Sequence, residues 1–145
     1  MLFRSAIRDA FPSACTPSGP AIACEPGTFL VAAAGILVAR VTTAWRKHGR
    51  HWIGLDCGQA VNVYGAHYGL ELELVPVDRP LAPALRPCSV AGNINEAGDV
   101  FMRERMLPEL AEGELVALLP AGAYGSSMAS DHCLRGQFAE VLVDG

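Results

Sequence analysis

The chain has 145 residues, which is enough for one domain with a single hydrophobic core. Charged side chains make up only 18% of it, below the roughly 25% typical of soluble domains, while apolar side chains make up 51%. We therefore expect part of the surface to be covered by a partner. The net charge of −4, with one short basic cluster at residues 40–50, argues against binding to nucleic acid.

The five cysteines show no C-x-x-C spacing, which argues against a disulfide framework or a zinc knuckle and favours a reducing cytoplasm. The first residues, "MLFRSAIRDAF", carry charges too closely spaced for a signal peptide. The longest apolar run, residues 29–39, is shorter than the roughly 20 residues that a membrane-spanning helix needs. The sequence thus predicts a cytoplasmic protein without a membrane segment.

In chain order, the first predicted element is an amphipathic helix over residues 2–11, which Pro12 ends. A Pro/Gly/Ser-rich connector leads to "AIAC", residues 21–24, which is predicted as a short buried strand stopping at Glu-Pro-Gly. Helix, loop and strand together make one α/β unit. We therefore interpret residues 1–27 as a remnant of an α/β domain.

After Gly27 the pattern changes to short apolar segments bounded by Gly, Pro or Asp. A short helix is predicted at "TFLVAAAG", and β-branched or alternating residues then predict strands. The predicted strands cover residues 36–45, 51–58, 70–77, 99–108, 114–122 and 139–145. Residues 28–145 are thus predicted to form a mainly β domain, an antiparallel barrel or sandwich.

Four stretches carry a resemblance to a known family: "EPGTFLVAAAGILVARV", "IGLDCG", "NEAGDVFMRERMLPELAEGELVALLPAGAYGSSMAS" and "AEVLVDG". In this order they resemble the C-terminal part of the fold-type III pyridoxal-phosphate (PLP) decarboxylases, the family of diaminopimelate, ornithine and arginine decarboxylases. The resemblance implies a C-terminal β-barrel of the alanine racemase/ornithine decarboxylase type, preceded here by one helix and strand of a (β/α)₈ barrel.

The resemblance also implies how the active site is assembled. Family members are similar in being head-to-tail dimers, in which the (β/α)₈ barrel of one subunit and the β-domain of the other enclose the cofactor. The barrel carries PLP on a Schiff-base lysine. Lys47 is the only lysine of this chain and lies in a polar turn, so we expect the Schiff-base lysine on a barrel that this chain does not supply.

Four residues resemble the family's cofactor-binding positions. Decarboxylation leaves a carbanion, which the pyridinium ring of PLP absorbs best when a carboxylate keeps its nitrogen protonated, and Glu25 matches that carboxylate. Gly27 and Thr28 stand where the family has Gly-Arg facing the phosphate, so a hydroxyl and a backbone N–H replace the arginine contact. Tyr124 matches a phosphate-binding tyrosine. The alternatives are a polar strand end for Glu25 and an aromatic packed on its own core for Tyr124.

Asn95 and Glu96 stand where the family has Cys-Glu or Cys-Asp, the thiol assisting proton delivery and the acid meeting the distal end of the substrate. Asn95 cannot donate a proton as a thiol does, while Glu96 remains a partner for a substrate amine. Asp99 is interpreted as a cap or turn residue. The region "DCGQAVNVYGAHYG" lacks the Arg-Pro pair of diaminopimelate decarboxylases, which argues against diaminopimelate as the substrate.

Two further patterns are interpreted as structural. His48 and His51 form an H-x-x-H in a charged turn without a third ligand, so no metal site is predicted there. Cys57 could suggest a thiol nucleophile, but a buried thiol at a strand end is the favoured interpretation.

The sequence therefore predicts the C-terminal domain of a PLP-dependent amino-acid decarboxylase, which completes an active site at a dimer interface and is inactive alone. Two alternatives stay open. The chain could be a non-catalytic regulatory module that pairs with a full-length paralogue, or one half of a split decarboxylase.

Overall fold

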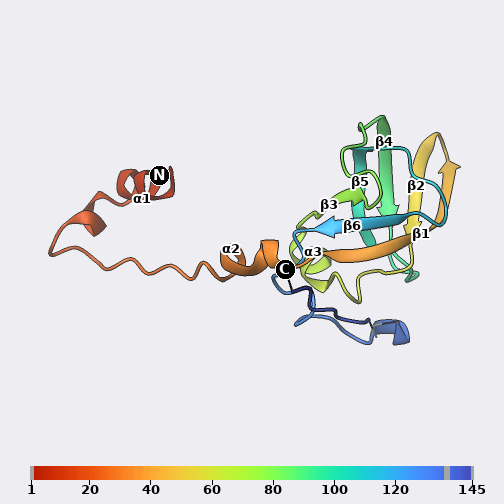
Figure 1. Ribbon diagram of the computed structural model, residues 1–145. Helices are drawn as coiled ribbons and strands as arrows, with labels where there is room; N and C mark the ends of the chain where they lie inside the picture. Colours follow the sequence, from red (N-terminus) through yellow and green to blue (C-terminus); the bar gives the residue numbers. More distant parts are fainter. Residues whose placement is uncertain (1, 136–137, 145) are drawn as a thin grey trace.

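A computed structural model describes residues 2–135 and 138–144 of the chain (Figure 1). The strands are β1 (Leu37–Lys47), β2 (Arg50–Leu55), β3 (Glu73–Pro76), β4 (Arg86–Ala91), β5 (Val100–Leu107) and β6 (Leu115–Leu119). The α-helices are α1 (Leu2–Ala10), α2 (Gly27–Val31) and α3 (Val63–Tyr68), and the 3-10 turns are η1 (Pro12–Cys15), η2 (Ala32–Ala34) and η3 (His132–Leu134). Among the described residues, no helix has the length and apolar character needed to span a bilayer.

All six strands form one sheet in the order β3-β6-β1-β2-β4-β5. Four of the five neighbouring pairs are antiparallel, as predicted, but β2 and β4 run parallel. Parallel neighbours need a long crossover, and residues 56–85 provide one by carrying α3 and β3 between the two strands. The prediction of a purely antiparallel domain is therefore wrong for this one pair.

The two edges of the sheet approach each other, so that the sheet forms a nearly closed barrel. Residues 71–76 at the β3 edge and residues 105–108 at the β5 edge line opposite sides of one hollow. An ion pair between the Arg105 guanidinium and the Glu71 carboxylate, 2.9 Å apart, crosses the gap between the edges. The barrel predicted from the sequence is confirmed.

The core lies inside this barrel and draws apolar side chains from its strands. Burial alternates along the first half of β1, with Ala39 and Val41 buried, and β6 contributes Val116 and Leu118. Leu55 at the end of β2 is also fully buried. These residues belong to one continuous hydrophobic cluster.

The β1–β2 hairpin has a two-residue turn, in which His48 and Gly49 both have positive φ, at 50° and 79°. This is the requirement of the turn type that matches the twist of antiparallel strands. Near the turn, Trp45 and Trp52 are paired across the strands, with stacked rings whose centroids lie 6.1 Å apart. The predicted polar turn is confirmed.

Two predicted strands are absent from the described residues. Residues 21–24 form no strand and are exposed, because no neighbouring strand supplies hydrogen-bond partners, and Figure 1 shows residues 2–26 extending away from the barrel. The predicted strand over residues 139–145 is also wrong for residues 139–144, and Gly145 lies outside the described residues. Conversely, neither α3 nor β4 was predicted. For β4, Pro80, Pro83 and Pro87 obscure the strand pattern before the buried Cys88.

Candidate active-site surface

Two loops, residues 92–99 and residues 120–130, meet beside one short stretch, residues 58–64. The Gln59 side chain contacts the loop of residues 92–99, and the Ala60 carbonyl accepts a hydrogen bond from the Ser130 amide at 2.9 Å. The Tyr64 ring stacks on Tyr124. The loops that carry Asn95, Glu96 and Tyr124 are therefore held together by residues that follow β2, whereas Glu25, Gly27 and Thr28 have no contact with this stretch among the described hydrogen bonds and ring contacts.

Asp99 fixes the shape of the loop that carries Glu96. It is 3% exposed, and its two carboxylate oxygens accept hydrogen bonds of 2.6 Å from the Gln59 and Ile94 amides. A Cβ on Gly92 would lie 2.2 Å from this carboxylate, so glycine is required there by close approach. The predicted turn role of Asp99 is confirmed, and the residue also joins two separate loops.

Glu96 is exposed at the tip of this loop and is held by two side chains. Its Oε1 lies 2.6 Å from Nε2 of His132, and its Oε2 accepts a 3.2 Å hydrogen bond from Nε2 of Gln59. The bond with His132, followed by the bond with Gln59, lowers the pKa of the Glu96 carboxyl below its ordinary value. Glu96 thus presents an ionised and oriented carboxylate, while the neighbouring Asn95 is exposed.

Tyr124 lies in a turn after β6, where its φ of 62° is unusual for a residue with a side chain. Its ring stacks on Tyr64 at a centroid distance of 4.6 Å, and Tyr64 in turn contacts Tyr68 at 5.1 Å. The residue is still 46% exposed. The ring therefore packs on neighbouring aromatics, as in the alternative considered from the sequence, while much of the side chain remains open to a ligand.

The α2–η2 segment is attached near Tyr124 through Gly122. The Gly122 amide donates to the Ala32 carbonyl at 2.9 Å, and a Cβ at Gly122 would meet the Val31 carbonyl oxygen at 2.1 Å. This close approach requires glycine. It holds the segment that begins with Gly27 and Thr28, both exposed, beside the turn that carries Tyr124.

Cys57 does not provide a nucleophile. It is buried, and its burial, followed by the negative charges of Asp56 and Asp99, raises the pKa of the thiol to about 12. The thiolate, which is the reactive form, is therefore scarce at neutral pH. The interpretation of Cys57 as a buried structural thiol is confirmed.

The structure adds residues that the sequence did not single out. Gln59 and His132 orient Glu96, and Tyr64 supports Tyr124. Residues 59 and 64 lie in the region that lacks the family's Arg-Pro pair, and His132 lies beyond the longest matching stretch, so the contacts of these residues with Glu96 and Tyr124 follow only from the folded chain. A hollow of about 430 Å³ lies next to η3 and is lined by Asp56, Asn93, Asp131, Leu134, Arg135 and Phe138.

A family model described as the C-terminal sheet domain of the pyridoxal-dependent decarboxylases matches residues 28–122. The chain belongs to this family. Diaminopimelate decarboxylases of Methanothermobacter thermautotrophicus and Pseudomonas aeruginosa are 40% and 42% identical to it over 124 and 123 residues. These matches cover 86% and 83% of the chain but 29% of each relative, so the chain spans less than a third of the length of these decarboxylases.

Solved decarboxylase structures share the fold of the chain. The Helicobacter pylori diaminopimelate decarboxylase in complex with L-lysine has a TM-score of 0.70 and 30% identity, covering 93% of this chain and 32% of that protein. The Vibrio vulnificus lysine/ornithine decarboxylase in complex with cadaverine has a TM-score of 0.69 and 27% identity, covering 94% and 36%. The predicted family and the β-barrel fold of its C-terminal domain are thus confirmed.

The decarboxylase family is PLP-dependent. Glu25, Thr28 and Tyr124, which the sequence predicts to bind this cofactor, carry one carboxylate and two hydroxyls, the kinds of group suited to a protonated ring nitrogen and a phosphate, and all three residues are exposed. None of these three side chains is hydrogen-bonded to another described residue, so they are open to a ligand. The Gly27 amide, by contrast, donates to the Glu25 carbonyl at 2.8 Å.

Proposed function

We propose that the chain is the C-terminal β-domain of a PLP-dependent amino-acid decarboxylase and completes an active site together with a (β/α)₈ barrel. The observation that carries the proposal is the family match over residues 28–122, which includes the loop that presents Glu96. In this proposal residues 1–27 belong to the last α/β unit of the barrel, and residues 28–145 form the β-domain.

The cofactor, when bound, supplies an electron sink for the carbanion that loss of CO₂ leaves. In our proposal the Glu25 carboxylate accepts the proton of the pyridinium nitrogen in a hydrogen bond, and the Thr28 and Tyr124 hydroxyls donate to the phosphate. Gly27 is proposed to face the phosphate, and no atom lies within 4 Å of the position that a Cβ would take there, so this side of its backbone is open. Asn95, which is exposed, is proposed to hydrogen-bond the reacting end of the substrate, without a thiol's ability to deliver a proton.

Glu96 is proposed to select the substrate. An ionised carboxylate pairs well with an ammonium group, and such charge-assisted bonds are stronger than neutral ones. The substrate class is therefore an amino acid with a second amine at its distal end. The missing Arg-Pro pair argues against diaminopimelate as the substrate, whereas the similarity to diaminopimelate decarboxylases argues for it.

Assembly with a second chain or a barrel is part of the same proposal. Phe29 and Leu30 in α2 are 85% and 71% exposed, which is apolar surface that a neighbouring domain or subunit would cover. A cytoplasmic location is supported by the described cysteines, Cys24, Cys57, Cys88 and Cys133, which are all free thiols.

Two substitutions separate the proposed roles when the barrel part of the Helicobacter pylori relative is fused to the chain. Tyr124→Phe removes one hydroxyl aimed at the phosphate and should weaken PLP binding by about 1 kcal/mol, with little change in substrate preference. Glu96→Gln should leave PLP binding intact but raise KM for diamino acids, because a charged hydrogen bond worth roughly 1.5 to 3 kcal/mol is lost.

The measurements are a PLP titration and CO₂ release from lysine, ornithine, diaminopimelate and an acidic amino acid. Glu73→Gln, which neutralises an exposed carboxylate on β3 outside the site, is the matched control and should change neither result. Loss of PLP binding in Glu96→Gln, or an altered substrate profile alone in Tyr124→Phe, would show that these two loops have other roles.

A further inference from the structure

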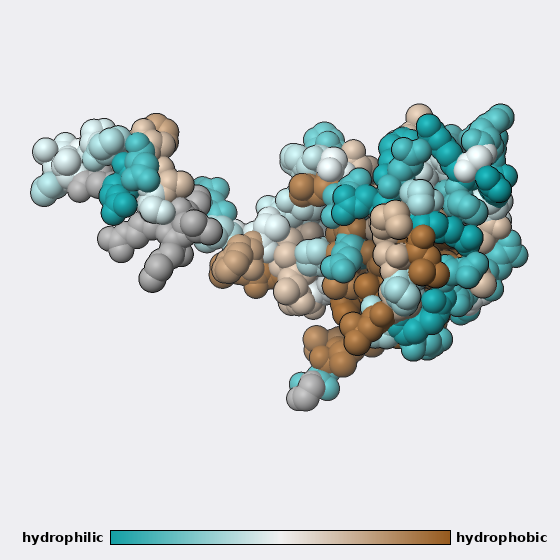
Figure 2. All heavy atoms as spheres, turned by 90° about the horizontal axis from the view of Figure 1, so that it is seen from above, coloured by the Kyte–Doolittle hydropathy of each residue, from teal (hydrophilic) through white to brown (hydrophobic). Residues whose placement is uncertain are grey.

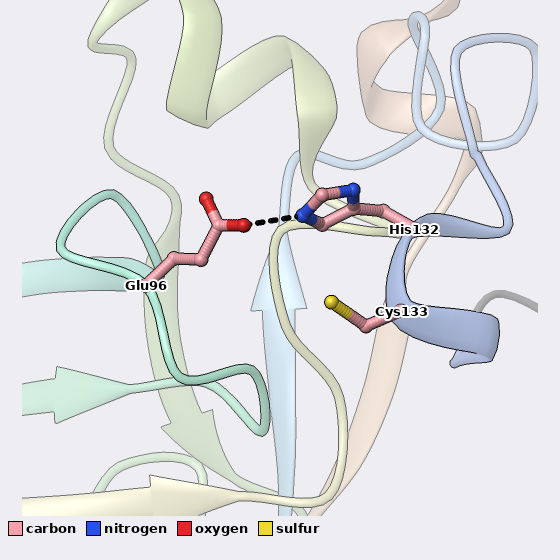
Figure 3. A group of neighbouring side chains, drawn as sticks. All are labelled: Glu96, His132 and Cys133. Atoms are coloured by element: carbon pink, nitrogen blue, oxygen red, sulfur yellow. Dashed lines mark hydrogen bonds and ion pairs between the residues drawn. The ribbon is translucent and has the colours of Figure 1, made fainter.

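Three side chains with metal-binding groups converge at the end of the candidate site (Figure 3). Oε1 of Glu96, Nε2 of His132 and Sγ of Cys133 all lie within 4.8 Å of one another. Figure 3 shows the Glu96 carboxylate on one loop facing the imidazole and thiol, which come from the η3 turn. All three residues are exposed, so an ion can reach them from solvent.

This donor set is the one that zinc prefers in proteins. Thiolate sulfur, imidazole nitrogen and carboxylate oxygen bind Zn²⁺ at about 2.3, 2.0 and 2.1 Å, usually in a tetrahedron. Two ligands of such a tetrahedron are roughly 3.4 Å apart, so the 2.6 Å separation of Glu96 Oε1 and His132 Nε2 would widen by less than about 1 Å. The side chains therefore need only a small adjustment to share one ion.

The surrounding structure already orients the Glu96 carboxylate, and the η3 turn presents the other two groups. Gln59 donates to the second oxygen of Glu96, which leaves Oε1 facing the cluster, and the Gln59 amide is itself bound to the buried Asp99. Cys133 and Leu134 have φ values of 54° and 57°, so the chain makes a left-handed turn here. The side chains of His132 and Cys133 both reach the Glu96 carboxylate from this turn. Outer contacts of this kind are what hold metal ligands in position.

We propose that Glu96, His132 and Cys133 bind one Zn²⁺ ion, with water at the fourth position. Binding breaks the S–H bond of Cys133, whose proton passes to the solvent while the sulfur lone pair coordinates the metal. No oxidant or reductant takes part. Because the ion occupies the carboxylate of Glu96, a bound zinc also excludes the ammonium group that this carboxylate is proposed to receive.

The test is a titration of the full chain with Co²⁺, a spectroscopic substitute for zinc, followed by displacement with Zn²⁺. We expect one metal per chain, a thiolate-to-cobalt charge-transfer band, and release of about one proton. Cys133→Ser should abolish the band, and His132→Ala and Glu96→Gln should weaken binding by roughly tenfold or more. No cofactor or barrel is needed, so this result is independent of the decarboxylase assay.

The matched controls are Cys24→Ser and His67→Ala, which remove an exposed thiol and an exposed imidazole outside the cluster. Both should bind cobalt as the unmodified chain does. Absence of a thiolate band, a band that persists in Cys133→Ser, or unchanged affinity in His132→Ala would overturn the proposal. Denaturant unfolding of each variant checks that the barrel is retained.

Discussion

At the scale of single residues, the position of the Glu96 carboxylate depends on the buried Asp99. The Asp99 side chain accepts one backbone N–H from its own loop and one from Gln59, which follows β2. Gln59 then reaches Glu96 from the other side. A change at Asp99 would therefore disturb both the carboxylate and the side chain that orients it.

Asp99→Asn should reduce the free energy of unfolding by about 1–3 kcal/mol. The NH₂ group of the new asparagine cannot accept a hydrogen bond, so either the Gln59 or the Ile94 backbone N–H would lose its partner. Urea denaturation at neutral pH measures the change. Asp78→Asn alters an exposed carboxylate and should stay within about 0.5 kcal/mol of the unmodified chain. Equal stability of the two variants would contradict the anchoring role of Asp99.

The exposure of a candidate site residue was predictable where a single position carries its own chemical signal. Glu96 stands out as an acid in a glycine-containing turn, and the structure does place it on an exposed loop. The contact between Glu96 and His132 joins residues 36 positions apart, and no local pattern in the sequence reports it. Tyr124 was predicted to reach outward, whereas its stacking on Tyr64 depends on the placement of α3.

At the scale of elements, the contact between the α2–η2 segment and the turn after β6 is a backbone contact. The two backbones can approach closely only because Gly122 has no side chain. The Ala121 amide donates to the Gly35 carbonyl, and the Gly122 amide donates to the Ala32 carbonyl. The α2–η2 segment is thus attached to the barrel by backbone hydrogen bonds at residues 121 and 122, just before Tyr124.

Gly122→Ala should separate these segments, since its Cβ would lie 2.1 Å from the Val31 carbonyl oxygen. We expect a loss of about 1–3 kcal/mol in unfolding free energy and faster hydrogen exchange at the amides of residues 121 and 122. Gly27→Ala, whose Cβ meets nothing within 4 Å, should change neither. Unaltered exchange in Gly122→Ala would show that the segment is held by other contacts.

Strands with apolar or β-branched runs between clear turn residues were predicted well from the sequence. β1 alternates between buried and exposed residues over its first half, while β2 and β6 are short apolar runs, and the glycine turn between β1 and β2 marks its own position. β4 was missed because its pairing with β2 is parallel and depends on a 30-residue crossover, which no local pattern specifies. Residues 21–24 look like a strand in composition but have no neighbour to pair with.

At the scale of the whole molecule, several exposed apolar side chains that are neighbours in sequence gather in two of the places where apolar surface remains (Figure 2). One is α2, with Phe29 and Leu30, and the other is the C-terminal tail, where Val141, Leu142 and Val143 are at least 80% exposed. Clustered apolar surface of this kind marks an interface. The low fraction of charged residues in the sequence predicted this property of the molecule.

The chain should therefore self-associate at micromolar concentration, which sedimentation velocity would detect. Phe29→Ser combined with Leu30→Ser should weaken association by roughly tenfold or more, since burial of each side chain is worth about 1.5–3 kcal/mol. Leu81→Ser removes an isolated side chain that is 96% exposed and should have little effect. A monomeric chain at high concentration would count against an interface on α2.

The stacked pair of Trp45 and Trp52 has an optical consequence. These are the two tryptophans of the chain, so its intrinsic indole fluorescence originates entirely from the β1–β2 hairpin. Figure 1 shows the hairpin turn at the end of the barrel away from α2 and the C-terminal loops. The emission therefore reports opening of the hairpin during denaturation, whereas ligands arriving at the Glu96 loop leave it unchanged unless the barrel itself is distorted.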